Sequence, residues 1–230
     1  MPRSGDEPTA PARLHRFLVA GTAGGVGTTT VAALLFAHLA KSGHPPIPID
    51  RTAGSLAERL PPTAGDLDQR LRVHDLGGHA ATALTQLSNQ TSHAVLVSAA
   101  TPLGCDLALA ELRRSAGREV DEVADRGSGT GDQRVVIVLA DVFGTRRLGR
   151  QMITALQAAP GVRGVVRLRR DHALAAADRI NAKNLSRRTT AAIGELATLL
   201  DATSQGWSMP SRPKRQSSPP MDWSHEIKTR

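Results

Sequence analysis

Aromatic side chains are nearly missing from this sequence of 230 residues. Phenylalanine, tryptophan and tyrosine together make up 2% of it, tyrosine does not occur, and both tryptophans, Trp207 and Trp223, stand near the C-terminus. Because hydrophobic residues still reach 40%, the core has to be built from alanine, valine, leucine and isoleucine. The length suits one α/β domain with short tails, or at most two small domains.

Cysteine is almost as scarce, and long apolar runs are missing. Cys105 is the only cysteine, which excludes an intramolecular disulfide and fits a reducing cytoplasm. No apolar run approaches the roughly 18 residues that a membrane-spanning helix needs. The first thirteen residues contain Asp6, Glu7 and three prolines and do not resemble a signal peptide. We therefore expect a soluble cytoplasmic protein.

Acidic residues are outnumbered, and the formal net charge is +8. Such a balance suits contact with nucleic acid or an anionic membrane, although an arginine-rich proteome gives the same balance without any function. Most of the excess positive charge lies between residues 163 and 188. This stretch has two acidic residues, Asp171 and Asp178, and eight basic ones: Arg163, Arg167, Arg169, Arg170, Arg179, Lys183, Arg187 and Arg188. No aromatic residues are interleaved for base stacking, which favours an ordinary solvated face over a DNA-binding one.

The chain divides into a domain and two tails. Residues 1–12 are rich in proline, serine and glycine, and residues 203–230 lack periodicity, so both are expected to be flexible. Residues 13–202 alternate apolar strands with helices. The strands are expected at 14–21, 46–50, 71–78, 92–101, 134–142 and 164–171. The helices are expected at 29–43, 80–89, 106–126, 145–159, 171–180 and 186–200.

This alternation predicts the fold class. Strands that read as continuous valine, isoleucine and leucine runs, separated by helices, indicate a three-layer α/β fold with a mostly parallel sheet covered on both faces. The prolines of segment 46–50 make it an edge-like or distorted strand. In such folds ligands bind at the carboxyl ends of the strands, where Gly21, Asp50 and Asp75 are expected to lie.

The segment GTAGGVGTTT, residues 21–30, joins the first strand to the first helix. Glycines in this position allow tight turns and close backbone approach, so that amide groups and the helix N-terminus face an anionic phosphate. The strict phosphate-loop pattern G-x-x-x-x-G-K-[ST] fails twice, because Thr22 takes its first glycine and Thr28 its lysine. Thr29 occupies the position whose hydroxyl would bind Mg²⁺. The alternative is a plain glycine-rich turn that binds nothing.

The segment AGGVGTTT, residues 23–30, resembles the deviant phosphate loop K-G-G-V-G-K-T-T of the MinD/ParA-like (SIMIBI-class) P-loop NTPases at six of eight positions. The two departures, Ala23 and Thr28, are the two lysine positions. In that family the first lysine reaches the partner's nucleotide across a dimer, and the second contacts the β- and γ-phosphates.

Later segments follow in the family's order. IDRTAGSL (49–56) resembles switch I, VHDLGG (73–78) resembles the Walker B and switch II segment, and RLRRDHALAAADRI (167–180) resembles a late segment that carries a proline in the family. The family's base-reading asparagine has no counterpart near residues 138–142. The resemblance spans about residues 14–202.

The resemblance implies ATP and Mg²⁺ as ligands, and a homodimer. It implies a metal site at Thr29 and Asp75, and nucleotide contacts at nine residues: Gly24, Gly25, Val26, Gly27, Thr28, Thr29, Thr30, Asp50 and Gly78. Loss of one positive charge near a reacting phosphoryl group costs on the order of 10²–10³ in rate, so we expect weak or absent hydrolysis. Arg51 is a candidate replacement for the missing charge.

Three other interpretations stay open beside a nucleotide switch. The chain is a pseudo-NTPase scaffold for an unidentified protein partner, or it binds DNA or an anionic membrane through its basic residues, or Asp50 and Asp75 merely cap loops. A metal site at His74 and Asp75 is disfavoured, because adjacent strand residues point to opposite faces. Cys105 is more simply a small buried residue than a nucleophile.

Overall fold

The computed structural model describes residues 14–52, 55–63, 65–88, 91–122, 134–142, 148–175 and 179–201. Six parallel strands form one sheet in the order β2-β3-β1-β4-β5-β6. The strands are β1 (His15–Gly21), β2 (Pro46–Asp50), β3 (Asp68–Asp75), β4 (Ser92–Ala99), β5 (Val135–Ala140) and β6 (Val162–Leu168). The expected tails lie outside the described residues.

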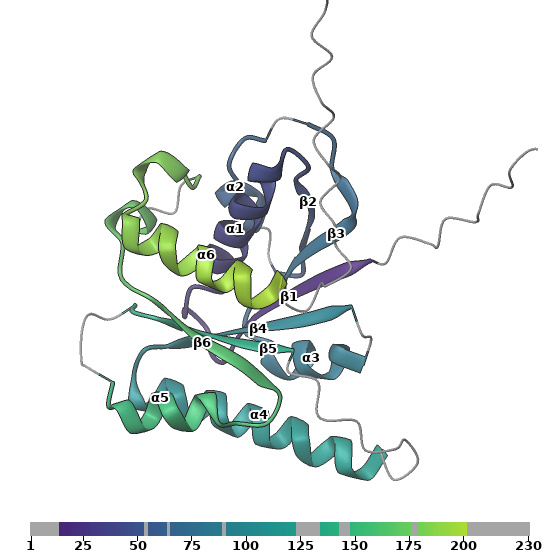
Figure 1. The fold of residues 1–230 in the computed structure, drawn as a ribbon, viewed down its shortest axis with the longest axis vertical. Coiled ribbons are helices and arrows are strands. Elements are labelled where there is room, and N and C mark those ends of the chain that lie inside the picture. The colour runs from purple at the N-terminus through teal and green to yellow at the C-terminus, as the bar shows by residue number, and fades with distance from the viewer. Residues whose placement is uncertain are drawn as a thin grey trace, which may run out of the picture.

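Helices cover both faces of this sheet, which confirms the three-layer α/β prediction (Figure 1). On one face lie α1 (Thr28–Leu39), α2 (Ser55–Arg59) and α6 (Arg187–Asp201). On the other face lie α3 (Ala80–Thr85), α4 (Pro102–Glu122) and α5 (Arg150–Gln157). Single turns of 3₁₀ helix occupy η1 (Ala40–Ser42), η2 (Gln86–Ser88), η3 (His172–Leu174) and η4 (Ala182–Asn184). None of the helices in the described ranges is long and apolar enough to span a membrane.

Two apolar clusters hold the layers together, one on each side of the sheet. Alternate residues of a strand enter opposite clusters: Val19 packs under α1 and α6, while its neighbours Leu18 and Ala20 pack under α3, α4 and α5. Every residue of β4 and β5 is buried, as continuous apolar runs in central parallel strands predict. The core contains mainly alanine, valine, leucine and isoleucine, in line with the composition.

The strand PIPID forms the edge of the sheet, as its prolines predicted. β2 pairs with β3 alone, and the register shifts between Pro46 and Ile47. A proline has no amide hydrogen to donate, so an edge strand with one paired side tolerates it at least cost. The consequence for the site is that Asp50, the last residue of β2, lies beside Asp75 of β3.

Two helix predictions fail over the described residues. The helix expected at 171–180 is replaced by the single turn η3, because the Asp171 carboxylate accepts the amide of Ala173 at 3.0 Å and that of Ser186 at 2.8 Å. These bonds bend the chain toward α6. The helix expected at 145–159 begins only at Arg150, after the extended residue Gly149. The local sequence favours longer helices, but side-chain hydrogen bonds and the conformation of the loops shorten them.

Candidate phosphate-binding site

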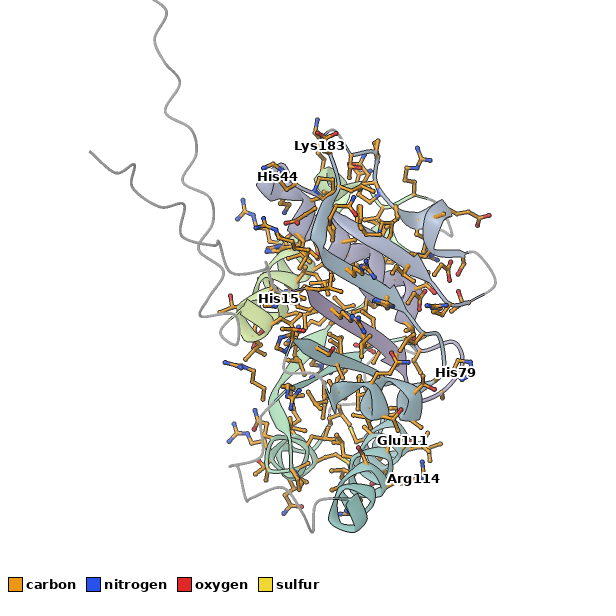
Figure 2. The ribbon with its side chains drawn as sticks, turned by 90° about the vertical axis from the view of Figure 1, so that its right-hand side faces the viewer. His15, His44, His79, Glu111, Arg114 and Lys183 are labelled. Carbon is orange, nitrogen blue, oxygen red and sulfur yellow. The ribbon has the colours of Figure 1, made fainter. Side chains whose placement is uncertain are left out.

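The carboxyl ends of β1, β3 and β4 meet at the centre of one edge of the sheet. The chain leaves β1 toward β2 and β3 on one side, whereas β4 leads to β5 on the other, so this is the topological switch point at which parallel sheets bind ligands. In Figure 2, His79, which follows β3, marks this edge, and His15, which begins β1, marks the opposite one.

The glycine loop between β1 and α1 is held in a conformation that only glycine adopts without strain. Gly25 has φ 74° and Gly27 has φ 90°, both in the left-handed region. Apart from the chain neighbours, no atom of the described residues lies within 4 Å of the Cβ that a larger residue would place at Gly24, Gly25 or Gly27. The space in front of the loop is therefore open, and the loop presents bare backbone to it.

Helix α1 begins directly behind this loop and its first amides lack caps. Gly27 is the N-cap residue, and no side chain in the described part of the structure caps the first turn. The amides of Thr28, Thr29 and Thr30 precede the first residue with a partner inside the helix, since Val31 donates to the Gly27 carbonyl at 3.0 Å. Uncapped amides and the positive end of the helix dipole together favour a negatively charged oxygen ligand.

Backbone contacts brace the loop against β3. The amide of Gly21 donates to the Gly77 carbonyl at 2.6 Å, and the amide of Gly77 donates to Asp75 Oδ1 at 3.0 Å. A Cβ at Gly21 would lie 2.5 Å from Thr28 Oγ1, so glycine is required where the first helical turn folds over the strand. The backbone of Ala23 and Gly24 lies within van der Waals reach of Gly78, so the two glycine segments are neighbours.

A chain of hydroxyl groups joins the loop to β4 and α4. Ser98 donates its hydroxyl hydrogen to the Gly104 carbonyl at 2.7 Å, so it accepts that of Thr22 at 2.8 Å. The Thr22 amide donates to the Val97 carbonyl at 2.9 Å. Thr22, which occupies the first glycine position of the strict phosphate-loop pattern, therefore anchors the loop at the switch point.

A pocket of about 390 Å³ opens in front of the loop and falls within the size range of small-molecule sites. Its lining includes all the predicted loop residues except Val26, together with Gly78: Ala23, Gly24, Gly25, Gly27, Thr28, Thr29, Thr30, Ser55, Glu58, Arg59, Gly77 and Gly78. The pocket therefore brings most of the predicted loop residues together, and helix α2 supplies a further wall that the sequence did not indicate.

Arg59 of α2 brings a positive charge to this pocket. Its Nη1 atom is buried and has no hydrogen-bond partner among the described residues, so the guanidinium keeps unused donors. Arg51, which the sequence suggested for this role, is not in the lining, and its charge instead helps to lower the pKa of His74. Arg59 lies in a short amphipathic segment, SLAER, and no motif drew attention to it.

The carboxylate of Asp50 accepts hydrogen bonds from the segment that follows it. Its Oδ1 accepts the amide of Thr52 at 2.7 Å and the Thr52 hydroxyl at 2.5 Å, and its Oδ2 accepts the amide of Leu56 at 3.0 Å. Burial alone would raise the pKa of Asp50, but these hydrogen bonds lower it below 3.8. Asp50 does not line the pocket, and its direct effect here is to fix the start of α2.

Of the two residues that the resemblance implies for a magnesium site, Thr29 lines the pocket, whereas Asp75 lies outside its lining. Asp75 is fully buried, and its Oδ2 has no partner among the described residues. A buried carboxylate oxygen without a partner is costly, and an ion or its water shell would satisfy it. Thr29 lines the pocket, with its hydroxyl 3.4 Å from that of Ser55. A hydroxyl, a carboxylate and phosphate oxygens are the hard donors that Mg²⁺ accepts together with water.

Two disfavoured candidates lie away from the pocket. His74 points to the opposite face of β3, where burial and then the charges of Arg16, Arg51 and Arg72 lower its pKa to about 4. Within the described ranges, no three metal-ligating side chains gather at one point. Cys105 is fully buried, and burial together with Asp106 raises the pKa of its thiol.

A second pocket, of about 310 Å³, lies on the other side of the N-terminus of α1. It shares Gly27 and Thr30 with the first pocket and also contains Val26, the remaining loop residue of the prediction. Its other walls are residues that end or follow β5 and β6: Ala140, Asp141, Val142, Leu168, Arg169, Arg170, Asp171, Leu174 and Ala175.

The basic stretch from Arg163 to Arg188 is divided among several elements. Arg163 and Arg167 lie half-buried on β6, Arg169 and Arg170 line the second pocket, and the others are exposed beyond it. Lys183 lies at the end of the molecule opposite to α4, which carries Glu111 and Arg114 (Figure 2). Part of this charge therefore faces a cavity instead of forming a flat exposed surface, and DNA binding stays a prediction.

No protein-family model matches the chain, and no curated protein matches its sequence. Among solved structures, a nucleotide-binding protein from Archaeoglobus fulgidus in complex with ADP is similar to it, with 16% sequence identity and a TM-score of 0.45. That similarity covers 70% of this chain and 83% of the other. The function therefore has to be inferred from this chain's own residues.

Proposed function

We propose that this protein binds a nucleoside triphosphate with Mg²⁺ at the glycine loop and acts as a MinD/ParA-like switch with little or no hydrolysis. The observation that carries the proposal is the loop itself. Gly25 and Gly27 hold left-handed conformations in front of open space, and the first amides of α1 behind them have no side-chain cap. A glycine-rich loop of this kind at the switch point of a parallel sheet suits phosphate.

Different residues around the pocket bind the phosphates and the metal ion. The loop amides hold the phosphate oxygens, and the Arg59 guanidinium supplies part of the charge of the missing lysines. Thr29 and Asp75 hold the ion, which neutralises the phosphates when bound. One cation remains where the family has two lysines, and Glu58 in the same lining opposes it. We therefore expect the site to bind nucleotide without rapid turnover, because phosphoryl transfer depends on positive charge at the developing anion.

Calorimetry with ATP and GTP, each with and without Mg²⁺, tests the proposal. We expect binding that depends on Mg²⁺, and a gain of roughly 10–100-fold in affinity for Thr28→Lys, since a charged hydrogen bond contributes about 1.5–3 kcal/mol. Arg59→Ala is expected to lose affinity by a similar factor. Arg51→Ala is the matched control, because Arg51 does not line the pocket, and its affinity should match that of the natural protein.

Two results would contradict the proposal. If neither nucleotide binds at millimolar concentration with Mg²⁺, the loop holds no nucleotide. Rapid turnover by the natural sequence, abolished by Asp75→Ala, would contradict the claim of slow hydrolysis.

The second candidate function is a pseudo-NTPase scaffold that keeps the fold for protein contacts alone. The replacement of both family lysines, by Ala23 and Thr28, favours it. The Thr28→Lys variant separates the two functions. A variant that binds nucleotide tightly while the natural protein binds none would identify a disabled site and support the scaffold.

A further inference from the structure

One half of the sheet carries helices mainly on a single face. Among the described residues, the helices that make the main contacts with β2 and β3 are α1 and α2, which lie on the same side. Helix α3 lies lower in Figure 1 and packs against β1 and β4. The other face of β2 and β3 therefore has little helix cover in the described part of the chain, and Figure 2 looks onto it.

The strand register shows which side chains share this face. His74 lies opposite Leu18, whose side chain enters the cluster under α3, α4 and α5. Paired residues of neighbouring parallel strands point to the same side, so Arg72, two residues before His74, and Arg16, opposite Arg72, share the face. Ile49 lies opposite His74 on the other side. We call this the arginine face, and its members are Arg16, Ile47, Ile49, Arg72 and His74.

The cations of the arginine face have no acidic partner among the described residues. Arg16 and Arg72 are half-buried, yet no carboxylate in these ranges lies within ion-pair distance of either. The Nε atom of Arg72 and the Nε2 atom of His74 are buried without a hydrogen-bond partner there, and only 8% of His74 is exposed. Burial, and then the charges of the two arginines and Arg51, lower the pKa of His74 to about 4. Like charges without a counter-charge repel one another, so the face suits an acidic partner.

The free edge of β2 does not compete for an extended partner. The amide of Arg51 points inward, to the Asp75 carbonyl at 2.9 Å, and amide directions alternate along a strand. Pro48 therefore stands at an outward position, where it has no amide hydrogen to donate. A partner for this half of the sheet is expected on the arginine face and not beside β2.

One segment of the same chain has the matching composition. The stretch MDWSHEI, residues 221–227, lies outside the described residues and contains Asp222 and Glu226 but no lysine or arginine. It also contains Trp223, and an indole ring is the aromatic group that attracts a guanidinium most strongly. Its methionine and isoleucine suit the half-buried isoleucines of the arginine face.

The chain is long enough to bring this segment to the face. Helix α6, which ends at Asp201, finishes near the start of β1, where His15 is labelled (Figures 1 and 2). The 20 residues 202–221 follow, and a chain of that length spans at most about 70 Å. Single surface ion pairs are weak, but a tethered segment has an effective concentration in the millimolar range, so weak contacts suffice.

We propose that segment 221–227 docks on the arginine face of its own chain. Its two carboxylates pair with Arg16 and Arg72, and the ring of Trp223 lies against the arginine and isoleucine side chains. The docked segment supplies the counter-charge that the described residues do not. None of the residues of the arginine face lines the pocket in front of the glycine loop, so the contact is independent of nucleotide binding.

The fluorescence of Trp223 in the full-length protein, without nucleotide, tests the proposal. The chain has no tyrosine, and Trp207→Phe leaves Trp223 as the only tryptophan. In this background Trp223 should emit at a shorter wavelength than in the urea-unfolded chain, and acrylamide should quench it several-fold more slowly. Salt at about 1 M, where the Debye length is about 3 Å, should remove most of this protection.

Charge reversal identifies the contacting residues. The pair Arg16→Glu and Arg72→Glu should expose Trp223, and so should the pair Asp222→Arg and Glu226→Arg. Combining all four substitutions should restore the protection, which a misfolded domain cannot do. Arg113→Glu, on the exposed surface of α4, is the matched control and should leave the emission unchanged.

Three results would overturn the proposal. Trp223 as exposed in the natural fold as in urea would leave the arginine face to an acidic partner from another molecule. Protection that survives both charge reversals would place the segment elsewhere on the domain. Protection that disappears on dilution would assign the face to the segment of a second copy and not to the chain's own.

Discussion

At the residue scale, neighbouring groups determine what the buried residues Asp75 and His74 do. Asp75 and His74 are adjacent on β3, yet Asp75 accepts the amide of Gly77 and His74 lies near the charges of three arginines. The sequence could assign them to opposite faces, because strand residues alternate. It could not reveal that Arg16 on β1 and Arg72 on β3 are cross-strand partners, since this depends on the strand order.

His74 is expected to make stability depend on pH. Its pKa is about 4 in the folded protein and near 6.5 unfolded, so the unfolded state binds more protons between these values. Stability therefore falls as pH falls through this window, by about 2 kcal/mol from pH 7 to pH 5. Urea unfolding at both pH values measures it. His74→Gln, which cannot titrate, should lose most of this difference, and an unchanged difference would contradict the prediction.

At the element scale, strands were easier to predict from the sequence than helix ends. All six strands were located, and β2 was placed at the edge, because continuous apolar runs and prolines act within one segment. The helix expected at 171–180 was wrong because the carboxylate of Asp171 bonds residues 15 and 18 positions away, which no local pattern contains. The α2 wall of the pocket was missed for the same reason: its role depends on packing against the loop.

Asp171 is expected to fasten β6 to the start of α6. Its Oδ2 accepts the Ser186 amide at 2.8 Å and the hydroxyl of the buried Thr189 at 2.6 Å. Asp171→Ala leaves these donors without a partner and should cost about 3 kcal/mol of unfolding free energy. Urea unfolding at pH 7 measures the loss. Asp106→Ala on the exposed surface of α4 is the control and should change stability by less than about 0.5 kcal/mol.

The same hydrogen bonds to Asp171 make the stability of the protein depend on pH, in a more acidic range than the one in which His74 acts. Burial alone would raise its pKa, but the bonds from Thr189, Ser186 and Ala173 lower it below 3.8. The stability that Asp171 contributes is therefore complete above pH 3.8 and lost as pH falls further. An equal loss of stability in Asp171→Ala and Asp106→Ala would contradict the fastening role.

At the scale of the whole molecule, the order of the strands brings distant residues to one site. β3 lies between β2 and β1, so the glycines after β3 meet the loop after β1, while β5 and β6 form the second pocket on the other side of α1. The sequence predicted a parallel sheet but not this order, because crossover connections of similar length fit several orders. The second pocket could therefore not be predicted.

Because the loop joins β1, β3 and α1, ligand binding should stabilise the whole domain. A nucleotide with Mg²⁺ at 100 times its dissociation constant adds about 2.7 kcal/mol, which corresponds to roughly 5–10 °C in Tm for a domain of this size.

Gly27→Ala, which forces a side chain into φ 90° and toward the open space before the loop, should lower Tm and abolish the shift. Gly117→Ala, inside α4 and with no atom near its Cβ, should keep the shift and raise the starting Tm slightly. Thermal unfolding with and without ligand measures both, and a full shift in Gly27→Ala would mean that the nucleotide binds elsewhere.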